Sequence, residues 1–412
     1  MHRMWWVLGV LLLVLPLGSF AQERGVTAEE VVVGTSMPLS GPAAYWGAVG
    51  RAMEAYARYL NDQGGIHGRR LRVVVRDDSY LPPRAAANVR ELVERVGVFA
   101  IVGLPDKAVA ESRERVRNAL HAIVGLIGTA NAFAVRDYIV RNEVVWITPT
   151  ADATIWYGFR DKKYLFVTYP SYVEEAKILV DYAAKQLGIK TVAVFYQNDL
   201  YGQKGLLGAK QGAVRSRVRL AAQVPYEVTQ TDVSSEAVKL RESRADAVLL
   251  YATPRHGALI VREMAKLGYT PKLLSSFTLG DPIMFALAGE AWNGVISTAF
   301  FPLPGTGDSR VDEALAILTR VDPALRANPF NALAGWAFME PFVEGLRRAG
   351  RELTRERFVT AMGSIRGWDG QVIRQVTFGP DRRQGTNRLF LTRAEGGRWT
   401  RLSDWISYPV GF

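Results

Sequence analysis

Residues 31–78 read VVVGTSMPLSGPAAYWGAVGRAMEAYARYLNDQGGIHGRRLRVVVRDD, and this stretch holds one complete structural unit. Its β-branched start, 31–34, predicts a buried strand. Apolar residues within 43–63 then recur at the i, i+3, i+4, i+7 spacing of a helix stripe. The glycine pair 64–65 ends that helix, because glycine adopts the left-handed backbone conformation without steric cost. A second strand is predicted at 71–75, so the unit runs strand, helix, strand.

The same alternation of short β-branched runs with amphipathic stretches continues through most of the chain. It predicts an α/β fold whose parallel sheets are covered by helices on both faces. The stretch 371–405 differs, because glycine-containing turns divide it into segments typical of antiparallel strands. Ligand sites in parallel sheets lie at the carboxyl ends of the strands. The further strands expected are 99–102, 144–147, 191–196, 247–251 and 273–276, and the further helices are 85–96, 173–187, 203–214 and 256–267.

Composition excludes several classes of function. The 412-residue chain contains no cysteine, which rules out disulfides, thiolate metal sites, a cysteine nucleophile and a lipid-modified cysteine. Its four histidines are scattered, so we expect no metal site and no cofactor. The formal net charge is +11, but Lys and Arg form no basic run, which favours a solvated surface over nucleic-acid binding. No catalytic motif is present, and the chain is not predicted to be an enzyme.

The first 21 residues have the features of a signal peptide. Arg3 is followed by an uncharged apolar core at 5–17, and Ser19-Phe20-Ala21 supplies the small residues that a cleavage site requires. The apolar core is too short to span a bilayer. An uncleaved membrane anchor is the alternative. Cleavage predicts a mature chain that starts near Gln22 and is located in the periplasm.

Candidate ligand-binding residues lie where loops lead into predicted helices. The segments 128–131 (GTAN) and 150–154 (TADAT) each precede a helix, whose free backbone N–H groups suit a carboxylate. Thr and Asn side chains at these places are also common helix caps, which is the alternative explanation. Helix starts that face one cleft would form a polar floor between aromatic walls. The candidates are Trp46, Thr129, Asn131, Thr150, Ala151, Asp152, Tyr201 and Phe277.

Six short motifs are distinctive in their order and spacing, namely 33–42 (VGTSMPLSGP), 60–68 (LNDQGGIHG), 75–78 (VRDD), 196–202 (YQNDLYG), 292–294 (WNG) and 378–381 (FGPD). Together they resemble the type I periplasmic binding proteins of the branched-chain amino acid (Leu/Ile/Val-binding) class. The resemblance extends over essentially the whole mature chain. It implies a non-catalytic protein that delivers a small ligand to an inner-membrane ABC permease, and we expect this protein to be a monomer. A ligand-sensing receptor domain of the same fold is the remaining alternative.

The resemblance also implies two Rossmann-like lobes that are joined by three crossovers and hold the ligand between them. We expect the first lobe to comprise 22–148 and 280–378, and the second lobe to comprise 149–279 and 379–412. One feature is unusual for the class. The sequence AIVGL occurs at 100–104 and again at 122–126, so 104–121 has the character of an insertion, and either copy can supply the strand.

Carried over residue by residue, the resemblance assigns roles to part of the site. Trp46 would stack on the ligand, and Tyr201 would close on it from the second lobe. Thr129 and the loop 150–152 would contact a carboxylate.

The loop after Ser275 departs from the pattern of the class. Amino-acid binders hold the ligand's ammonium there with an acidic residue, whereas this chain has Phe277. A buried ammonium without a carboxylate costs several kcal/mol. Asp152 and Asp281 are the candidate substitutes. Otherwise the expected ligand is an aromatic or aliphatic carboxylate that lacks an ammonium.

Overall fold

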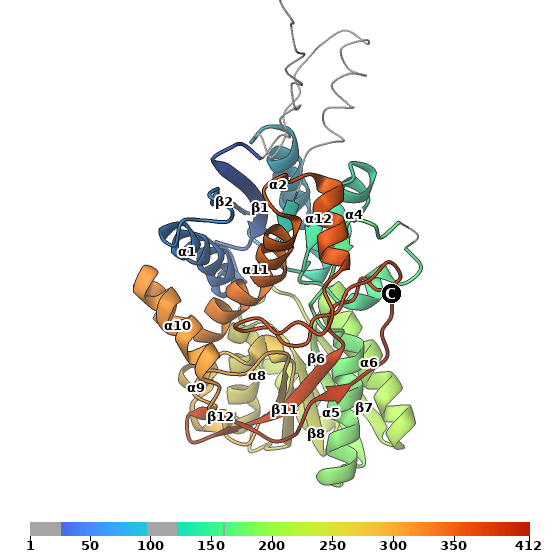
Figure 1. The fold of residues 1–412 in the computed structure, drawn as a ribbon. Coiled ribbons are helices and arrows are strands. Elements are labelled where there is room, and N and C mark those ends of the chain that lie inside the picture. Colours follow the sequence, from blue (N-terminus) through green and yellow to red (C-terminus); the bar gives the residue numbers. More distant parts are fainter. Residues whose placement is uncertain (1–25, 97–121, 160) are drawn as a thin grey trace, which may run out of the picture.

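The computed structural model describes residues 26–96, 122–159 and 161–412. In these residues the chain forms two α/β lobes, each built on its own sheet (Figure 1). No helix in this part of the chain has the length and apolarity needed to cross a membrane. The predicted signal peptide (1–21), the strand expected at 99–102 and the segment 104–121 lie outside the described residues.

The first lobe contains a parallel five-stranded sheet with the order β2-β1-β3-β4-β5. Different helices cover its two faces, because successive side chains of a strand point to opposite sides. On β1, Gly34 faces Leu92 of α2, whereas Met37 faces Gly50 of α1. Three later helices complete the lobe, and one of them, α11, packs on α1. The elements are β1 (Glu30–Met37), η1 (Ala44–Gly47), α1 (Ala48–Asp62), β2 (Arg70–Asp77), α2 (Pro82–Glu94), β3 (Ala122–Val124), α4 (Thr129–Arg141), β4 (Val145–Ile147), η2 (Ala153–Trp156), β5 (Leu165–Phe166), α10 (Ser309–Val321), η5 (Pro323–Ala327), α11 (Pro329–Ala349) and α12 (Arg355–Gly363).

The second lobe contains a mixed sheet with the order β12-β11-β10-β9-β8-β6-β7, and β13 pairs with β11. Central strand β8 is buried along its whole length, as expected of a parallel strand covered on both faces. Strands β11 and β12 are antiparallel, which confirms the prediction for residues 388–401, whereas 371–387 forms no strand. The elements are α5 (Tyr172–Gln186), β6 (Thr191–Gln197), α6 (Leu200–Ser216), β7 (Arg219–Tyr226), α7 (Ser234–Glu242), β8 (Ala247–Tyr251), α8 (Pro254–Lys266), β9 (Lys272–Ser275), η3 (Phe277–Leu279), α9 (Ile283–Ala288), η4 (Gly289–Trp292), β10 (Ile296–Ala299), β11 (Arg388–Glu395), β12 (Arg398–Arg401) and β13 (Ile406–Ser407).

The chain passes between the lobes three times, after β5, after β10 and before β11 (Figure 1). Two strands correct the expected lobe boundaries. Strand β5 pairs with β4 in the first sheet, although we expect 149–279 in the second lobe. Strand β10 pairs with β9 and β11 in the second sheet, although we expect 280–378 in the first. Irregular loops mark both expected boundaries, but these loops border the cleft, and each crossing comes one strand later.

The duplicated AIVGL sequence has one copy within the described residues. The second copy supplies β3, which lies between β1 and β4 in the first sheet. The three-residue strand is buried throughout. The copy at 122–126 therefore fills the central strand position that the fold requires.

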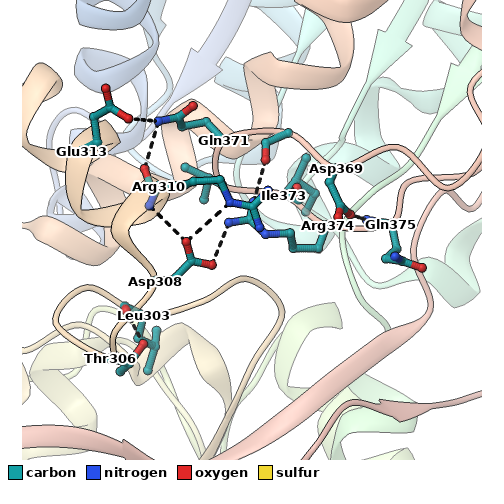
Figure 2. Close-up of polar contacts among 12 residues, drawn as sticks. Leu303, Thr306, Asp308, Arg310, Glu313, Asp369, Gln371, Ile373, Arg374 and Gln375 are labelled. Atoms are coloured by element: carbon teal, nitrogen blue, oxygen red, sulfur yellow. Dashed lines mark hydrogen bonds and ion pairs between the residues drawn. The ribbon is translucent and has the colours of Figure 1, made fainter.

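Polar contacts tie the start of α10, just after the second crossing, to the loop that leads toward the third (Figure 2). The buried guanidinium of Arg374 pairs with Asp308 at 2.8 Å and donates to the carbonyl of Gly370 at 2.7 Å. The Gln371 side chain donates to Glu313 at 2.8 Å. Partial burial alone would raise the pKa of Asp308, but the hydrogen bond and charge of Arg374 lower it below its ordinary value. These contacts hold two connecting segments in a fixed relation.

Candidate functional site

A cavity lies between the two lobes, at the carboxyl ends of their strands. The space free of protein atoms amounts to about 500 Å³, part of it open to solvent. Eight of the strands are followed by a lining residue in the next loop or first helical turn, as expected for sites in parallel sheets. Helix α11 adds residues from the side of the first lobe. The lining residues are Trp46, Val49, Tyr80, Ile127, Gly128, Thr129, Thr150, Tyr169, Tyr172, Tyr201, Phe277, Thr278, Phe300, Phe330, Asn331, Ala334 and Phe338.

Aromatic side chains from both lobes meet at one side of the cavity. The Trp46 ring of the first lobe lies 5.6 Å from the Tyr80 ring and 6.3 Å, edge to face, from the Tyr201 ring of the second lobe. A polar contact crosses the gap as well, since Gln197 Nε2 donates to the Tyr80 hydroxyl at 3.4 Å. The lobes therefore touch each other through the residues that line the cavity.

A packed group of aromatic rings continues this wall, since the Tyr172 ring lies 4.8 Å from the Tyr201 ring. Tyr172 stacks on Phe277 with ring centroids 5.5 Å apart, and Tyr169 meets Phe277 edge to face at 5.4 Å. The hydroxyls of Tyr169 and Tyr172 bond each other at 2.7 Å, and the Tyr201 hydroxyl bonds Thr278 Oγ1 at 2.6 Å. Burial raises the pKa of these three tyrosines well above the ordinary value, so their hydroxyls stay neutral.

The first turn of α4 forms a polar floor. Gly128 precedes the helix with φ +112°, and no side chain caps the helix there. A Cβ at Gly128 would lie 2.9 Å from Cε2 of Tyr80, so glycine allows the Tyr80 ring to approach the helix start. The Thr150 hydroxyl donates to the Leu126 carbonyl at 2.7 Å and fixes the adjacent loop. Unpaired N–H groups and the positive end of the helix dipole make this floor suited to an anion.

Five of the eight candidate residues line the cavity, namely Trp46, Thr129, Thr150, Tyr201 and Phe277. The other three do not. Asn131 Nδ2 donates to the Ile127 carbonyl at 3.1 Å, and the side chain is buried beside the helix start. Ala151 is fully buried in the core of the first lobe.

Asp152 has a structural position and is absent from the residues that line the cavity. Its Oδ2 accepts hydrogen bonds from the backbone N–H of Tyr172 at 2.6 Å and from the Ser171 hydroxyl at 3.2 Å. Its Oδ1 accepts from the N–H of Thr154 at 2.8 Å. The carboxylate thus satisfies the N-termini of two helical segments, α5 and η2, and both of its oxygens are occupied.

Two other buried carboxylates near the cavity also accept hydrogen bonds from protein groups. Asp281 accepts from the Tyr45 hydroxyl at 2.6 Å and from the N–H of Ile283 at 3.0 Å. Glu175 lies behind Phe277 and accepts from the Phe277 N–H at 2.7 Å. Burial raises the pKa of Glu175 to about 7, and its hydrogen bonds only partly oppose that shift. Burial also raises the pKa of Asp281 above its ordinary value, although the hydrogen bonds that its carboxylate accepts act to lower it.

The structure adds cavity residues that the sequence patterns did not single out. Tyr80, Tyr169, Tyr172 and Phe300 follow strands β2, β5 and β10, so the strand-end rule could have identified them. Residues of α11 follow no strand. Phe330, Asn331 and Phe338 reach the cavity because α11 packs across it, and local sequence carries no signal of that position.

No group of three or more His, Asp or Glu side chains converges as a metal site within residues 26–96, 122–159 and 161–412. The lining residues also lack the glycine-rich turn that holds a nucleotide phosphate. What the cavity offers is apolar surface, hydroxyl and amide groups, and a helix N-terminus. Such a surface suits reversible binding of a small organic molecule.

Comparisons with known proteins agree with this architecture. The family model described as "Periplasmic binding protein" matches residues 30–120 and 105–398. The Leu/Ile/Val-binding protein homolog 3 of Brucella melitensis is 25% identical over 78% of this chain and 80% of its own length. A branched-chain amino acid ABC transporter structure from Thermus thermophilus with bound valine superposes with a TM-score of 0.80, at 18% identity over 93% of this chain and 98% of its own.

A fatty acid ABC transporter substrate-binding protein from Thermomonospora curvata superposes with a TM-score of 0.78, at 22% identity over 95% of this chain and 97% of its own. Both structures show the same two-lobed fold. The resemblance drawn from the sequence motifs is thereby confirmed. The chain belongs to the periplasmic binding protein family, in the type I class that contains the Leu/Ile/Val-binding proteins.

Proposed function

We propose that this protein is the substrate-binding subunit of an ABC importer, which captures a small amino acid or organic carboxylate and delivers it to an inner-membrane permease. The observation that carries the proposal is the cavity at the strand ends, which takes lining residues from both lobes. A ligand there contacts both lobes at once. Binding therefore stabilises the closed arrangement of the lobes, which is the form that a permease can distinguish.

Different lining residues would contact the apolar part and the carboxylate of the ligand. Trp46 and Tyr201 supply adjoining aromatic surfaces from the two lobes, and Phe277 extends the apolar wall. Thr129 and Thr150 lie at the α4 start, where a carboxylate finds N–H donors and the positive end of the helix dipole. The named ligands of the structural neighbours, valine in one and a fatty acid in the other, both carry a carboxylate.

Export and oligomeric state belong to the same proposal. The motif at 1–21 supports secretion through a cleavable signal peptide, and a periplasmic location agrees with the family. We expect a monomer, because one chain supplies both walls of the cavity.

A ligand screen with paired variants tests the proposal. Purified protein, unfolded and refolded to remove carried-over ligand, is titrated with amino acids, short fatty acids, benzoates and amides while its melting temperature is followed. A ligand that binds only the native state raises the apparent stability by about 4 kcal/mol when present at roughly 1,000 times Kd.

For the best ligand, Trp46→Ala and Tyr201→Ala are each expected to raise Kd at least about 30-fold, since each removes a buried aromatic wall. Phe133→Ala, an exposed aromatic on α4 that does not line the cavity, is the control and should leave Kd within about threefold. Equal Kd values in all three variants would place the ligand elsewhere and contradict the proposal.

A further inference from the structure

The cavity lining has no group that can neutralise a cation. Among the described lining residues there is no Asp, Glu, Lys, Arg or His. The ionisable side chains that remain are tyrosines, and burial raises the pKa of Tyr80, Tyr169, Tyr172 and Tyr201. Their hydroxyls stay neutral, and a ligand ammonium would lose its water without gaining a charged partner.

Three buried carboxylates near the cavity, those of Asp152, Asp281 and Glu175, already accept hydrogen bonds from the protein. The oxygens of Asp152 hold the N-termini of α5 and η2. Asp281 holds Tyr45 and the start of α9. Glu175 holds the Phe277 N–H and the Thr298 hydroxyl, both on its Oε1, and lies behind the aromatic wall. None of the three belongs to the cavity lining.

The floor of the cavity, at the N-terminus of α4, favours an anion over a cation. Helix α4 is 13 residues long, begins at Thr129 against the cavity and has no side-chain cap at its N-terminus. The positive end of its dipole attracts an anion and repels a cation. Aromatic walls alone could also hold a quaternary ammonium through cation–π contacts. The position of α4 argues against that ligand, because a cation would lie beside the positive helix end.

From these contacts we infer that the natural ligand is a small monocarboxylate with an apolar body and no ammonium group. The inference rests on the proposed function, since it names the substrate class of the same cavity. The carboxylate lies at the start of α4, and the apolar body lies between Trp46, Tyr201 and Phe277. An α-amino acid with the same body would have to bury its ammonium against these rings.

Matched ligand pairs test the inference. Calorimetric titrations compare 4-methylpentanoate with leucine, and 3-phenylpropionate with phenylalanine, because the members of each pair differ only in the α-ammonium group. We expect the acid of at least one pair to bind 100-fold or more tightly than its amino acid, and choline not to bind. A tenfold ratio corresponds to about 1.4 kcal/mol, so the expected ratio matches the loss of hydration of an unpaired ammonium.

A designed carboxylate provides the second arm. Thr278 lines the cavity and its hydroxyl bonds Tyr201, so Thr278→Asp introduces an acid among the rings. The preference for the acid of the pair should fall at least tenfold in Thr278→Asp. It should stay within threefold of the original in Thr278→Asn, which has nearly the same shape and no charge.

The outcomes separate this inference from the proposed function. Leucine or phenylalanine binding as tightly as its matched acid would overturn the ligand class and leave the capture function standing. Tight choline binding would do the same. If no member of either pair binds, the inference is overturned, and the wider screen with the Trp46 and Tyr201 variants decides separately whether the cavity captures another ligand.

Discussion

Glu175 couples the stability of this protein to pH. The side chain is fully buried and accepts hydrogen bonds from Tyr251 at 2.8 Å and from the Phe277 N–H at 2.7 Å. Burial nevertheless dominates and raises its pKa to about 7 from an ordinary value of 4.5. The folded protein therefore holds a proton that the unfolded chain releases between these two values. Stability from this group is present below the lower value and is lost as pH rises toward 7.

We expect the free energy of unfolding, relative to that of Glu175→Gln, to fall by about 3 kcal/mol between pH 4.5 and pH 8. Urea unfolding of both proteins at several pH values measures the difference. Glu242→Gln, at an exposed position, is the control and should run parallel to the parent protein. A pH profile of Glu175→Gln that also runs parallel would show that Glu175 keeps an ordinary pKa.

Residue types at the strand ends allowed part of the candidate site to be predicted from the sequence. Trp46, Tyr201 and Phe277 were identifiable because bulky aromatic side chains follow predicted strands, and all three line the cavity. Asp152, by contrast, does not line the cavity. An acid in a loop before a helix can bind a ligand or cap the chain, and only the approach of α5, which starts 20 residues later, shows that Asp152 caps.

At the scale of elements, Asp152 joins α5 to η2, so its substitution should lower the stability of the protein more than its affinity for ligand. Asp152→Ala leaves the N–H groups of Tyr172 and Thr154 without an acceptor in a buried place, and we expect a loss of about 2–4 kcal/mol in the free energy of unfolding. Asp152→Asn keeps one acceptor oxygen and should lose about half as much. Chemical denaturation measures both values.

Ligand affinity of the folded Asp152→Ala protein should change less than about tenfold, because the carboxylate does not line the cavity. If Asp152→Ala weakened ligand binding without lowering the free energy of unfolding, Asp152 would instead be a ligand-binding residue.

The contribution of helix α11 to the cavity could not be predicted from the local sequence pattern. It runs for 21 residues and most of its side chains are buried, because it lies between α1, α12 and the cavity. A helix that is apolar on nearly all sides has no stripe from which its orientation can be derived. Its contribution of Phe330, Asn331 and Phe338 to the site follows from tertiary packing, which the sequence pattern does not contain.

At the scale of the whole molecule, alternation of strands and helices predicted an α/β fold with parallel sheets, and the motif resemblance implied two lobes with a ligand between them. The lobe boundaries were each missed by one strand. Strands β5 and β10 are short and precede a crossing, so their membership depends on hydrogen-bonded neighbours rather than on their own sequence. The three connections leave the lobes joined through narrow segments, which is the arrangement that permits hinge motion.

If one small molecule is held by both lobes together, its binding must change the distance between the lobes. The chain has no cysteine, so spin labels attach only at introduced sites, Leu81→Cys beside Tyr80 in the first lobe and Leu207→Cys on α6 in the second, both exposed. The label separation is measured by double electron–electron resonance on refolded protein, with and without the ligand that most raises its melting temperature. Capture between the lobes predicts a broader, longer distribution without ligand and a single shorter distance with it. A distribution that the stabilising ligand leaves unchanged would contradict capture between the lobes.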